Sequence, residues 1–205
     1  MQPSNLLFYD TETTGLPLWN DPSSDPRQPH LVQLGFKVVD PTTRLTLDAV
    51  DVIIKPDGWT IPDEVAKIHG ITTEKAHDEG IPERVALGLL LEAWATCCRR
   101  IGHNERFDAR IIRIGLFRFN EATVADHWKD GAAECTATLS SPILNLPPTE
   151  KMVRARFNKP KTPKLSEAYE FFTGQPLDGA HNAMVDVNAC ESVYWAMKDR
   201  QQAAA

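Results

Sequence analysis

The chain has 205 residues, of which 42% are apolar and 24% charged, the usual composition of a globular protein with enough length for one well-buried domain. No apolar run approaches the roughly 20 residues that cross a bilayer, and the N-terminal residues lack the basic and apolar regions of a secretory signal. We therefore expect one domain over residues 1–205, cytoplasmic and not associated with a membrane. The net charge of −6 is not typical of a nucleic-acid-binding protein, unless the acids gather around bound cations.

The first part of the chain carries strand signals. Residues 5–10 are apolar and aromatic, as in a buried strand. Residues 31–39 and 45–54 are rich in β-formers and are joined by the turn-like residues 40–44, which predicts a hairpin. The intervening residues 17–29 are rich in Pro, Asn, Asp and Ser and predict a surface loop.

Helical signals dominate the rest of the chain. The expected segments are a short helix over 62–70, another starting near 72, a helix over 82–99, a strand end at 101–104 leading into a helix from 106, a strand at 133–137, an irregular stretch at 142–163, and helices near 165–173 and 182–200. The apolar positions of the 82–99 helix are Val85, Leu89, Leu90, Ala93, Trp94 and Cys97. Strands followed by alternating helices and strands predict an α/β fold with a mixed sheet and helices on its faces.

The four cysteines do not have the spacing of a zinc site. Cys97 and Cys98 are adjacent, while Cys135 and Cys190 are far from them in sequence. We expect all four to be reduced and most of them to lie in the core, as is usual in a cytoplasmic protein.

Carboxylates stand out at the end of the first predicted strand. Asp10 and Glu12 are two residues apart, so on a strand their side chains point to the same face and can reach one metal ion. Carboxylate oxygens suit hard cations such as Mg²⁺ or Mn²⁺. Taken alone, such a pair is also common on protein surfaces.

Two later segments combine an acid with His and Asn. Asp108 follows Asn104 by one helical turn. His181 and Asp186 are five residues apart, about 140° around a helix axis, so they can flank one site without binding the same atom. Taken alone, Asp108 is equally an ordinary acid on a helix surface, and His181 equally a histidine that caps a helix.

In combination these segments form a recognisable set. The three segments are Asp10-Thr11-Glu12-Thr13-Thr14-Gly15, His103-Asn104-Glu105-Arg106-Phe107-Asp108 and His181-Asn182-Ala183-Met184-Val185-Asp186. With them, the chain from residue 5 to 196 resembles the histidine-type DEDD 3′→5′ exonucleases, the group that includes the proofreading subunit of bacterial DNA polymerase III. The other branch of that superfamily carries Tyr at the position of Asn182, whereas His181 matches the histidine branch. The resemblance implies an RNase H-like fold, with a mixed sheet of about five strands flanked by helices.

The resemblance also implies a chemistry. Two divalent metal ions, Mg²⁺ or Mn²⁺, would be held by Asp10, Glu12, Asp108 and Asp186, and His181 would act as the general base. The substrate would be DNA with a free 3′ end, preferably single-stranded, and the products nucleoside 5′-monophosphates. Residues 1–205 would then form a single exonuclease domain.

Substrate contacts are expected from six residues. The candidates are Thr13, Thr14, Leu16, His69, Asn104 and Phe107. For Leu16, His69 and Phe107, packing in the core is an equally good interpretation. The remaining histidines are interpreted as structural, for His103, or as surface or core residues, for His30, His77 and His127.

Other readings stay open at this point. The same fold can act on RNA, and no residue here distinguishes the 2′-OH. A non-catalytic nucleic-acid-binding module would have lost at least one of the five catalytic positions, and all five are present. A polymerase partner is possible but no tethering segment indicates one. The long loop at 17–29, the basic run at 151–164 and Gln33, where many relatives carry an acid, are departures or features without an assigned role.

Overall fold

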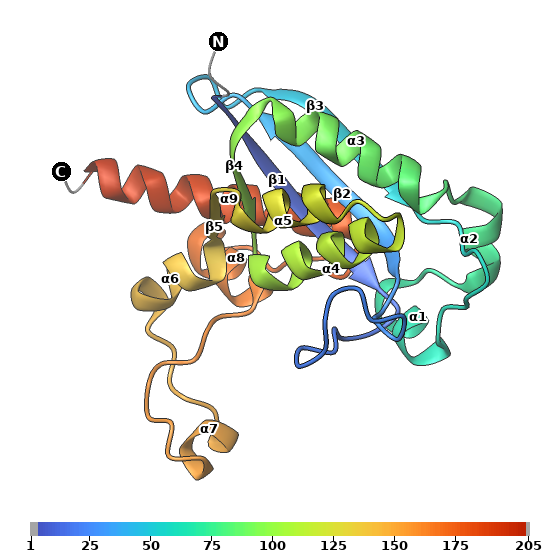
Figure 1. The fold of residues 1–205 in the computed structure, drawn as a ribbon. Helices are drawn as coiled ribbons and strands as arrows, with labels where there is room; N and C mark the ends of the chain where they lie inside the picture. The colour runs from blue at the N-terminus through green and yellow to red at the C-terminus, as the bar shows by residue number, and fades with distance from the viewer. Residues whose placement is uncertain (1–3, 204–205) are drawn as a thin grey trace.

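The computed structural model describes residues 4–203 (Figure 1). Two short ends lie outside the described part, residues 1–3 and residues 204–205. The expectation of no secretory signal rested in part on residues 1–3. None of the helices in residues 4–203 combines the length and the apolar character needed to cross a membrane.

A mixed sheet forms the centre of the fold. Across the sheet the strands are β3 (Thr46–Ile53), β2 (Leu31–Val39), β1 (Asn5–Thr13), β4 (Cys97–Gly102) and β5 (Ala133–Cys135). β1 pairs antiparallel with β2, and β2 antiparallel with β3, which confirms the predicted hairpin. β4 and β5 extend the sheet in parallel from the other edge of β1. This five-stranded mixed sheet confirms the predicted fold class.

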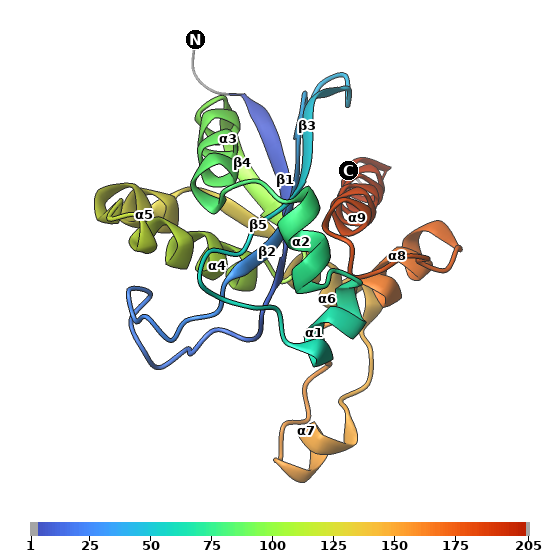
Figure 2. The ribbon, with the colours of Figure 1, turned by 90° about the vertical axis from the view of Figure 1, so that its right-hand side faces the viewer.

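Helices cover both faces of the sheet. Within residues 4–203 they are α1 (Asp63–His69), α2 (Thr73–Glu79), α3 (Glu83–Ala95), α4 (Glu105–Arg118), α5 (Ala122–Asp130), α6 (Thr136–Leu144), α7 (Glu150–Arg154), α8 (Leu165–Thr173) and α9 (Ala183–Ala203). Figure 2 shows α3, α4 and α5 on one side of the sheet and α8 and α9 on the other. The helix α7 sits at the tip of an arm that projects from the body in both views, and this arm carries most of the basic run at 151–164.

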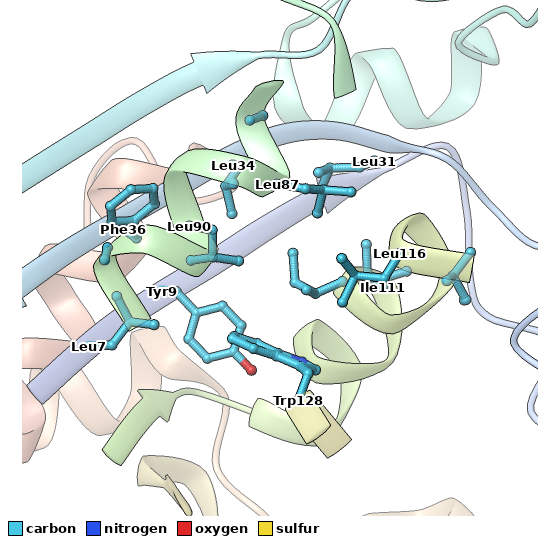
Figure 3. Packing of buried hydrophobic residues seen from close by; sticks show 14 of the residues in the cluster. Leu7, Tyr9, Leu31, Leu34, Phe36, Leu87, Leu90, Ile111, Leu116 and Trp128 are labelled. Carbon is cyan, nitrogen blue, oxygen red and sulfur yellow. The ribbon is translucent and has the colours of Figure 1, made fainter. Parts of the chain in front are cut away.

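Alternation along β1 divides the core in two. Leu7 and Tyr9 point toward α3 and α4 and join a large cluster that includes Trp128 (Figure 3). Leu6 and Phe8 point the other way and pack against α9. Because side chains on a strand alternate between faces, the next even-numbered residues of β1 lie on the α9 side. This register fixes the side of the sheet on which the first two carboxylates stand.

The helix predicted over 82–99 is shorter than expected. α3 ends at Ala95, and Cys97 already belongs to β4. Val85 and Leu89 are exposed, and the buried positions of the helix include Leu87 and Leu90. The run is apolar on several sides, and of the expected apolar positions the packing against β2 and β4 buries Leu90 and Ala93 but leaves Val85 and Leu89 outside.

Three further expectations need correction. The helix α5 was not predicted, and the stretch 142–163, expected to be irregular, contains the end of α6 and all of α7. The strand expected at 133–137 stops at Cys135, where α6 begins, and α6 accommodates Pro142.

The cysteines are only partly core residues. Within the described chain all four are free thiols, as expected. Cys97 and Cys190 are buried, whereas Cys98 is exposed and Cys135 is half-buried. The expectation that most of them lie in the core therefore holds for two of the four.

Candidate active site

The first two carboxylates lie at the end of β1, on its α9 side. Asp10 is paired with Gly35 of β2, and Glu12 with Gln33. Gly35 allows a close approach, because a Cβ at this position would lie 2.8 Å from the carbonyl carbon of Ala183. The start of α9 therefore rests directly on the backbone of β2, beside the two acids.

Hydrogen bonds fix the start of α9 in this place. The Ala183 N–H donates to Oε1 of Gln33 over 3.2 Å. The same Gln33 side chain donates from Nε2 to Asp51 over 2.7 Å. Asn182 caps the helix, accepting from the Val185 N–H over 3.2 Å. The buried Gln33, which had no assigned role in the sequence, is thus a link between the sheet and the helix that carries the third motif.

His181 and Asp186 meet Glu12 at this point. His181 is exposed, has a left-handed backbone with φ of 67°, and donates its N–H to Oδ2 of Asp186 over 3.1 Å. The other oxygen of Asp186, Oδ1, is buried and has no hydrogen-bond partner among the described residues. Glu12, His181 and Asp186 each present a ligand atom within 4.8 Å of the others. The three side chains can therefore face one ion or one substrate atom.

Asp108 reaches the site from α4, on the other side of the sheet. Its Oδ1 accepts from both the N–H and the hydroxyl of Thr11, over 3.1 and 2.7 Å. At 2% exposure Asp108 is almost fully buried. Thr11, which the sequence reasoning missed, therefore ties the second motif to the first.

A buried polar network holds the start of α4. Glu105 accepts from the Tyr9 hydroxyl over 2.8 Å and from Arg100 Nε over 2.6 Å. Arg100 also lies 4.5 Å from the centre of the Trp128 ring. This network joins β1, β4 and α5 to the first turn of α4, one helical turn before Asp108.

The acids of the site share one electrostatic environment. Burial, followed by the charges of Asp108, Asp186 and Glu12, raises the pKa of Asp10 well above its ordinary value. Burial and then the charge of Asp186 raise the pKa of Glu12 to about 7. Burial also raises the pKa of Asp108 well above its usual range, against the hydrogen bonds from Thr11 that lower it. Keeping several carboxylates ionised so close together, away from water, costs free energy. A bound cation would offset that cost.

The residues present fit divalent cations. Carboxylate oxygens with one imidazole beside them are a donor set that magnesium or manganese accepts. The buried, unpartnered Oδ1 of Asp186 and the mutual repulsion of the acids are the features that a cation would satisfy. Asp10, Glu12, Asp108 and Asp186 are the residues that could hold it.

The structure places the six substrate candidates in different settings. Thr13 donates its hydroxyl to the Gly15 carbonyl over 2.8 Å, and the Thr14 hydroxyl accepts from the His30 N–H over 2.9 Å. Both side chains thus shape the turn after β1. Leu16 is 78% exposed, so core packing does not explain it.

Of the other three candidates, Phe107 and His69 are more enclosed and Asn104 is not. Phe107 packs against the large core cluster, and His69 is buried, with Nδ1 accepting from the Ile71 N–H over 3.1 Å. Burial and then the charge of His181 lower the pKa of His69. Asn104 is exposed and left-handed, with φ of 68°, just before α4. A substrate contact stays a prediction for all six.

The remaining histidines lie outside this group. His103 bridges the Thr136 hydroxyl, at 2.9 Å, and the Pro163 carbonyl, at 3.0 Å, which fits a structural residue. His77 and His127 are exposed, and His30 is half-buried and stacked on Trp59.

The motifs and the fold agree with one family. The model of the RNase_T exonuclease family matches residues 7–194, almost the whole described chain. The chain belongs to this exonuclease family. Its members are nucleases, and membership extends over the strands and helices that carry all three motifs.

Solved structures share the fold. The crystal structure of E. coli Exonuclease I in complex with a dT13 oligonucleotide has a TM-score of 0.75 at 20% identity, covering 98% of this chain and 42% of that chain. The zinc ion bound form of the E. coli ExoI–ssDNA complex gives 0.72 at 20% identity, with 98% and 42% covered. A product-bound structure of exonuclease I gives 0.73 at 21%, with 98% and 45% covered. The chain spans less than half the length of these proteins, and no curated protein matches it in sequence.

Proposed function

We propose that this member of the exonuclease family is a divalent-metal-dependent 3′→5′ exonuclease that acts on DNA, preferably single-stranded, and releases nucleoside 5′-monophosphates. The observation that carries the proposal is the convergence of Glu12, His181 and Asp186 within 4.8 Å, in a site to which β1 also brings the half-buried Asp10 and α4 the buried Asp108. Nuclease chemistry needs concentrated carboxylate ligands for cations together with a general base, and these residues supply both.

The four carboxylates have distinct positions for this task. Burial and the charges of Asp108, Asp186 and Glu12 all raise the pKa of Asp10. Asp10, Glu12 and Asp186 would hold one cation, and Asp108 would help to hold a second with Asp10. Two divalent cations bound there would stabilise the charge on the attacking and leaving oxygens of a phosphodiester.

His181 is the proposed general base. Its ring is exposed, while its backbone N–H is tied to Asp186, so the imidazole is anchored next to the carboxylates and open to solvent. It would take the proton of the attacking water as the water oxygen bonds to phosphorus. The bond from phosphorus to O3′ then breaks and O3′ takes a proton from solvent water, which leaves a 3′-hydroxyl on the shortened strand and a 5′-phosphate on the released nucleotide.

Single-stranded DNA is supported as the substrate by the similar structures, which hold dT13 and other single-stranded oligonucleotides. The exposed Leu16, directly after the first motif, is available to pack on a base. RNA is the alternative substrate, and the first experiment compares the two.

That experiment is a gel time course with a single-stranded DNA and the matching RNA, each labelled at the 5′ end. With Mg²⁺ or Mn²⁺ we expect a ladder that shortens from the 3′ end, faster for DNA, and no cleavage in EDTA. Faster cleavage of the RNA would mean that RNA, and not DNA, is the preferred substrate. Cleavage of neither strand in either metal would leave a non-catalytic binding module as the better interpretation.

The variant His181→Ala tests the assignment of the base. We expect it to lose at least about a hundredfold in kcat, in line with the usual contribution of general-base catalysis, and to keep its thermal stabilisation by Mn²⁺. The matched control is His77→Ala, an exposed histidine on α2, which should retain full activity. A near-native kcat for His181→Ala would refute the role of this residue.

A further inference from the structure

Cations gather where α4 meets the loop between β1 and β2. Arg106, Arg110 and Arg113 follow one another at i, i+4 and i+7, so they lie along one side of α4. Together with Trp19 of the loop and Lys129 of α5 they line a hollow of about 300 Å³, which we call the arginine hollow. In a chain with a net charge of −6, this is a local excess of positive charge.

The acids around the arginine hollow do not neutralise it. Glu105 pairs with Arg100 at 2.6 Å, and Asp126 pairs with Arg113 at 2.7 Å. The other three cations of the hollow, on α4 and α5, have no carboxylate partner among residues 4–203. Their charge is therefore available to an incoming anion.

The loop at 17–29 lies beside α4 in both ribbon views (Figures 1 and 2), and hydrogen bonds from α4 attach it there. Inside the loop, the buried Gln28 donates from Nε2 to the carbonyls of Leu18 and Pro22 over 3.1 and 2.9 Å. Arg110 donates to the Leu18 carbonyl over 3.5 Å, and Arg113 to the Ser23 hydroxyl over 3.1 Å. The loop was expected only as a surface segment, and it is in fact a packed element.

Trp19 is an exposed aromatic residue of this loop. It is 45% exposed, and the guanidinium of Arg106 lies 5.1 Å from the centre of its ring. An exposed aromatic ring beside a guanidinium matches the sequence-tolerant way in which proteins bind single strands, with stacked bases and neutralised phosphates.

The arginines repel one another. Burial, followed by the charges of Arg113 and Arg106, lowers the pKa of Arg110. The buried Nε atoms of Arg110 and Arg113 have no hydrogen-bond partner within the described chain. A phosphate group, with its negative charge, would offset the repulsion between the guanidinium groups.

We propose that the arginine hollow binds backbone phosphates of the substrate strand upstream of the nucleotide being removed, with Trp19 stacked on a base. This rests on the proposed nuclease function, because it gives the strand that ends at the carboxylates a second point of contact. The long loop after the first motif is thereby assigned a role in substrate binding.

The position of the hollow predicts a dependence on substrate length. Arg106 and Asp108 are two residues apart, about 200° around the axis, so they lie on opposite sides of α4. A helix with its side chains is about 10–12 Å across, so one nucleotide cannot occupy both places. Substitutions in the arginine hollow should therefore leave the hydrolysis of short substrates unchanged and slow that of longer ones.

Binding without hydrolysis is measured first. Fluorescence anisotropy of a 5′-labelled 16-nucleotide single strand in EDTA, over a series of salt concentrations, compares the wild type with Arg106→Glu and Trp19→Ala. We expect each variant to bind about tenfold more weakly, and the slope of log K against log salt to fall by about 0.7 for the arginine variant, the value for one phosphate contact on a single strand. The matched control is Arg200→Glu, with the same charge change near the end of α9.

Hydrolysis of two lengths then separates this proposal from the proposed function. We expect Arg106→Glu to lower kcat/KM at least tenfold for the 16-nucleotide strand and to leave that for the dinucleotide d(TpT) unchanged. Equal losses at both lengths, or anisotropy and kinetics equal to those of Arg200→Glu, would overturn the arginine hollow as a binding site. A wild type that cleaves neither length would instead refute the nuclease function, and the anisotropy would still decide the hollow.

Discussion

Glu12 is an acid that the fold holds at a thermodynamic cost. Burial and the charge of Asp186 raise its pKa from an ordinary 4.5 to about 7. A raised pKa means that the folded protein prefers the protonated carboxyl, so the charged form destabilises the fold. We predict that Glu12→Gln, which removes the charge and keeps the shape, stabilises the metal-free protein at pH 8 while abolishing nuclease activity.

The size and the pH range follow from the two pKa values. Below pH 4.5 the carboxyl is protonated in both the folded and the unfolded chain, and the substitution should change little. As pH rises through about 7 the folded wild type must ionise Glu12. A rise in pKa from 4.5 to about 7 corresponds to about 3 kcal/mol, and the partial exposure of the side chain reduces this to about 2. For a chain of 205 residues, that is about 4–8 °C in Tm.

Urea denaturation in EDTA at pH 8 and pH 4.5 measures the difference, with Glu64→Gln, an exposed acid of α1, as the control. Adding Mn²⁺ at a hundred times its Kd should stabilise the wild type by about 2.7 kcal/mol and the variant by less. The reasoning fails if Glu12→Gln is no more stable than wild type at pH 8, or if its advantage is the same at pH 4.5.

Three further predictions concern the surroundings of the site. Gly35→Ala should cost about 1–3 kcal/mol, because its Cβ would press on the Ala183 backbone, whereas Gly88→Ala on α3, with open space around it, should not destabilise; urea denaturation compares them. Gln33→Ala should cost about 1–3 kcal/mol by leaving the Ala183 N–H unpaired, and should weaken Mn²⁺ binding in calorimetry; unchanged stability would contradict this link. Burial lowers the pKa of His30 from 6.5 to about 4, so its stabilising contribution is present above pH 6.5 and is lost as pH falls toward 4; the wild type should lose stability relative to His30→Asn over that range, and parallel curves would disprove it.

Local patterns were enough to predict much of this protein. The apolar run at 5–10 predicted β1, and the two β-rich runs after it predicted the hairpin. The strand period placed Asp10 and Glu12 on one face, because that period depends only on backbone geometry. The motifs indicated an exonuclease family over residues 5–196 before any contact was known, and the family model matches residues 7–194.

Local patterns failed where several faces of an element are apolar or where turns are short. The 82–99 run is apolar on several sides, so its sequence does not specify which side packs against the sheet. The end of α3 at Ala95 is likewise set by the packing against the sheet. The helix α5 was missed although its apolar residues lie on one side, and the arm helix α7, with 5 residues, is too short to show a helical period.

The sequence by itself determined which residues have the chemistry of this site, because carboxylates, a histidine and their spacing within each motif are local properties. Only the tertiary structure decided how the motifs meet. Gly35 and Gln33 allow the start of α9 to pack on β2. The Thr11 hydroxyl donates a hydrogen bond to Asp108 of α4. The loop at 17–29 became a packed partner of the arginines in the same way. Such contacts join residues far apart in sequence, and no period or motif within one segment specifies the segment it will touch.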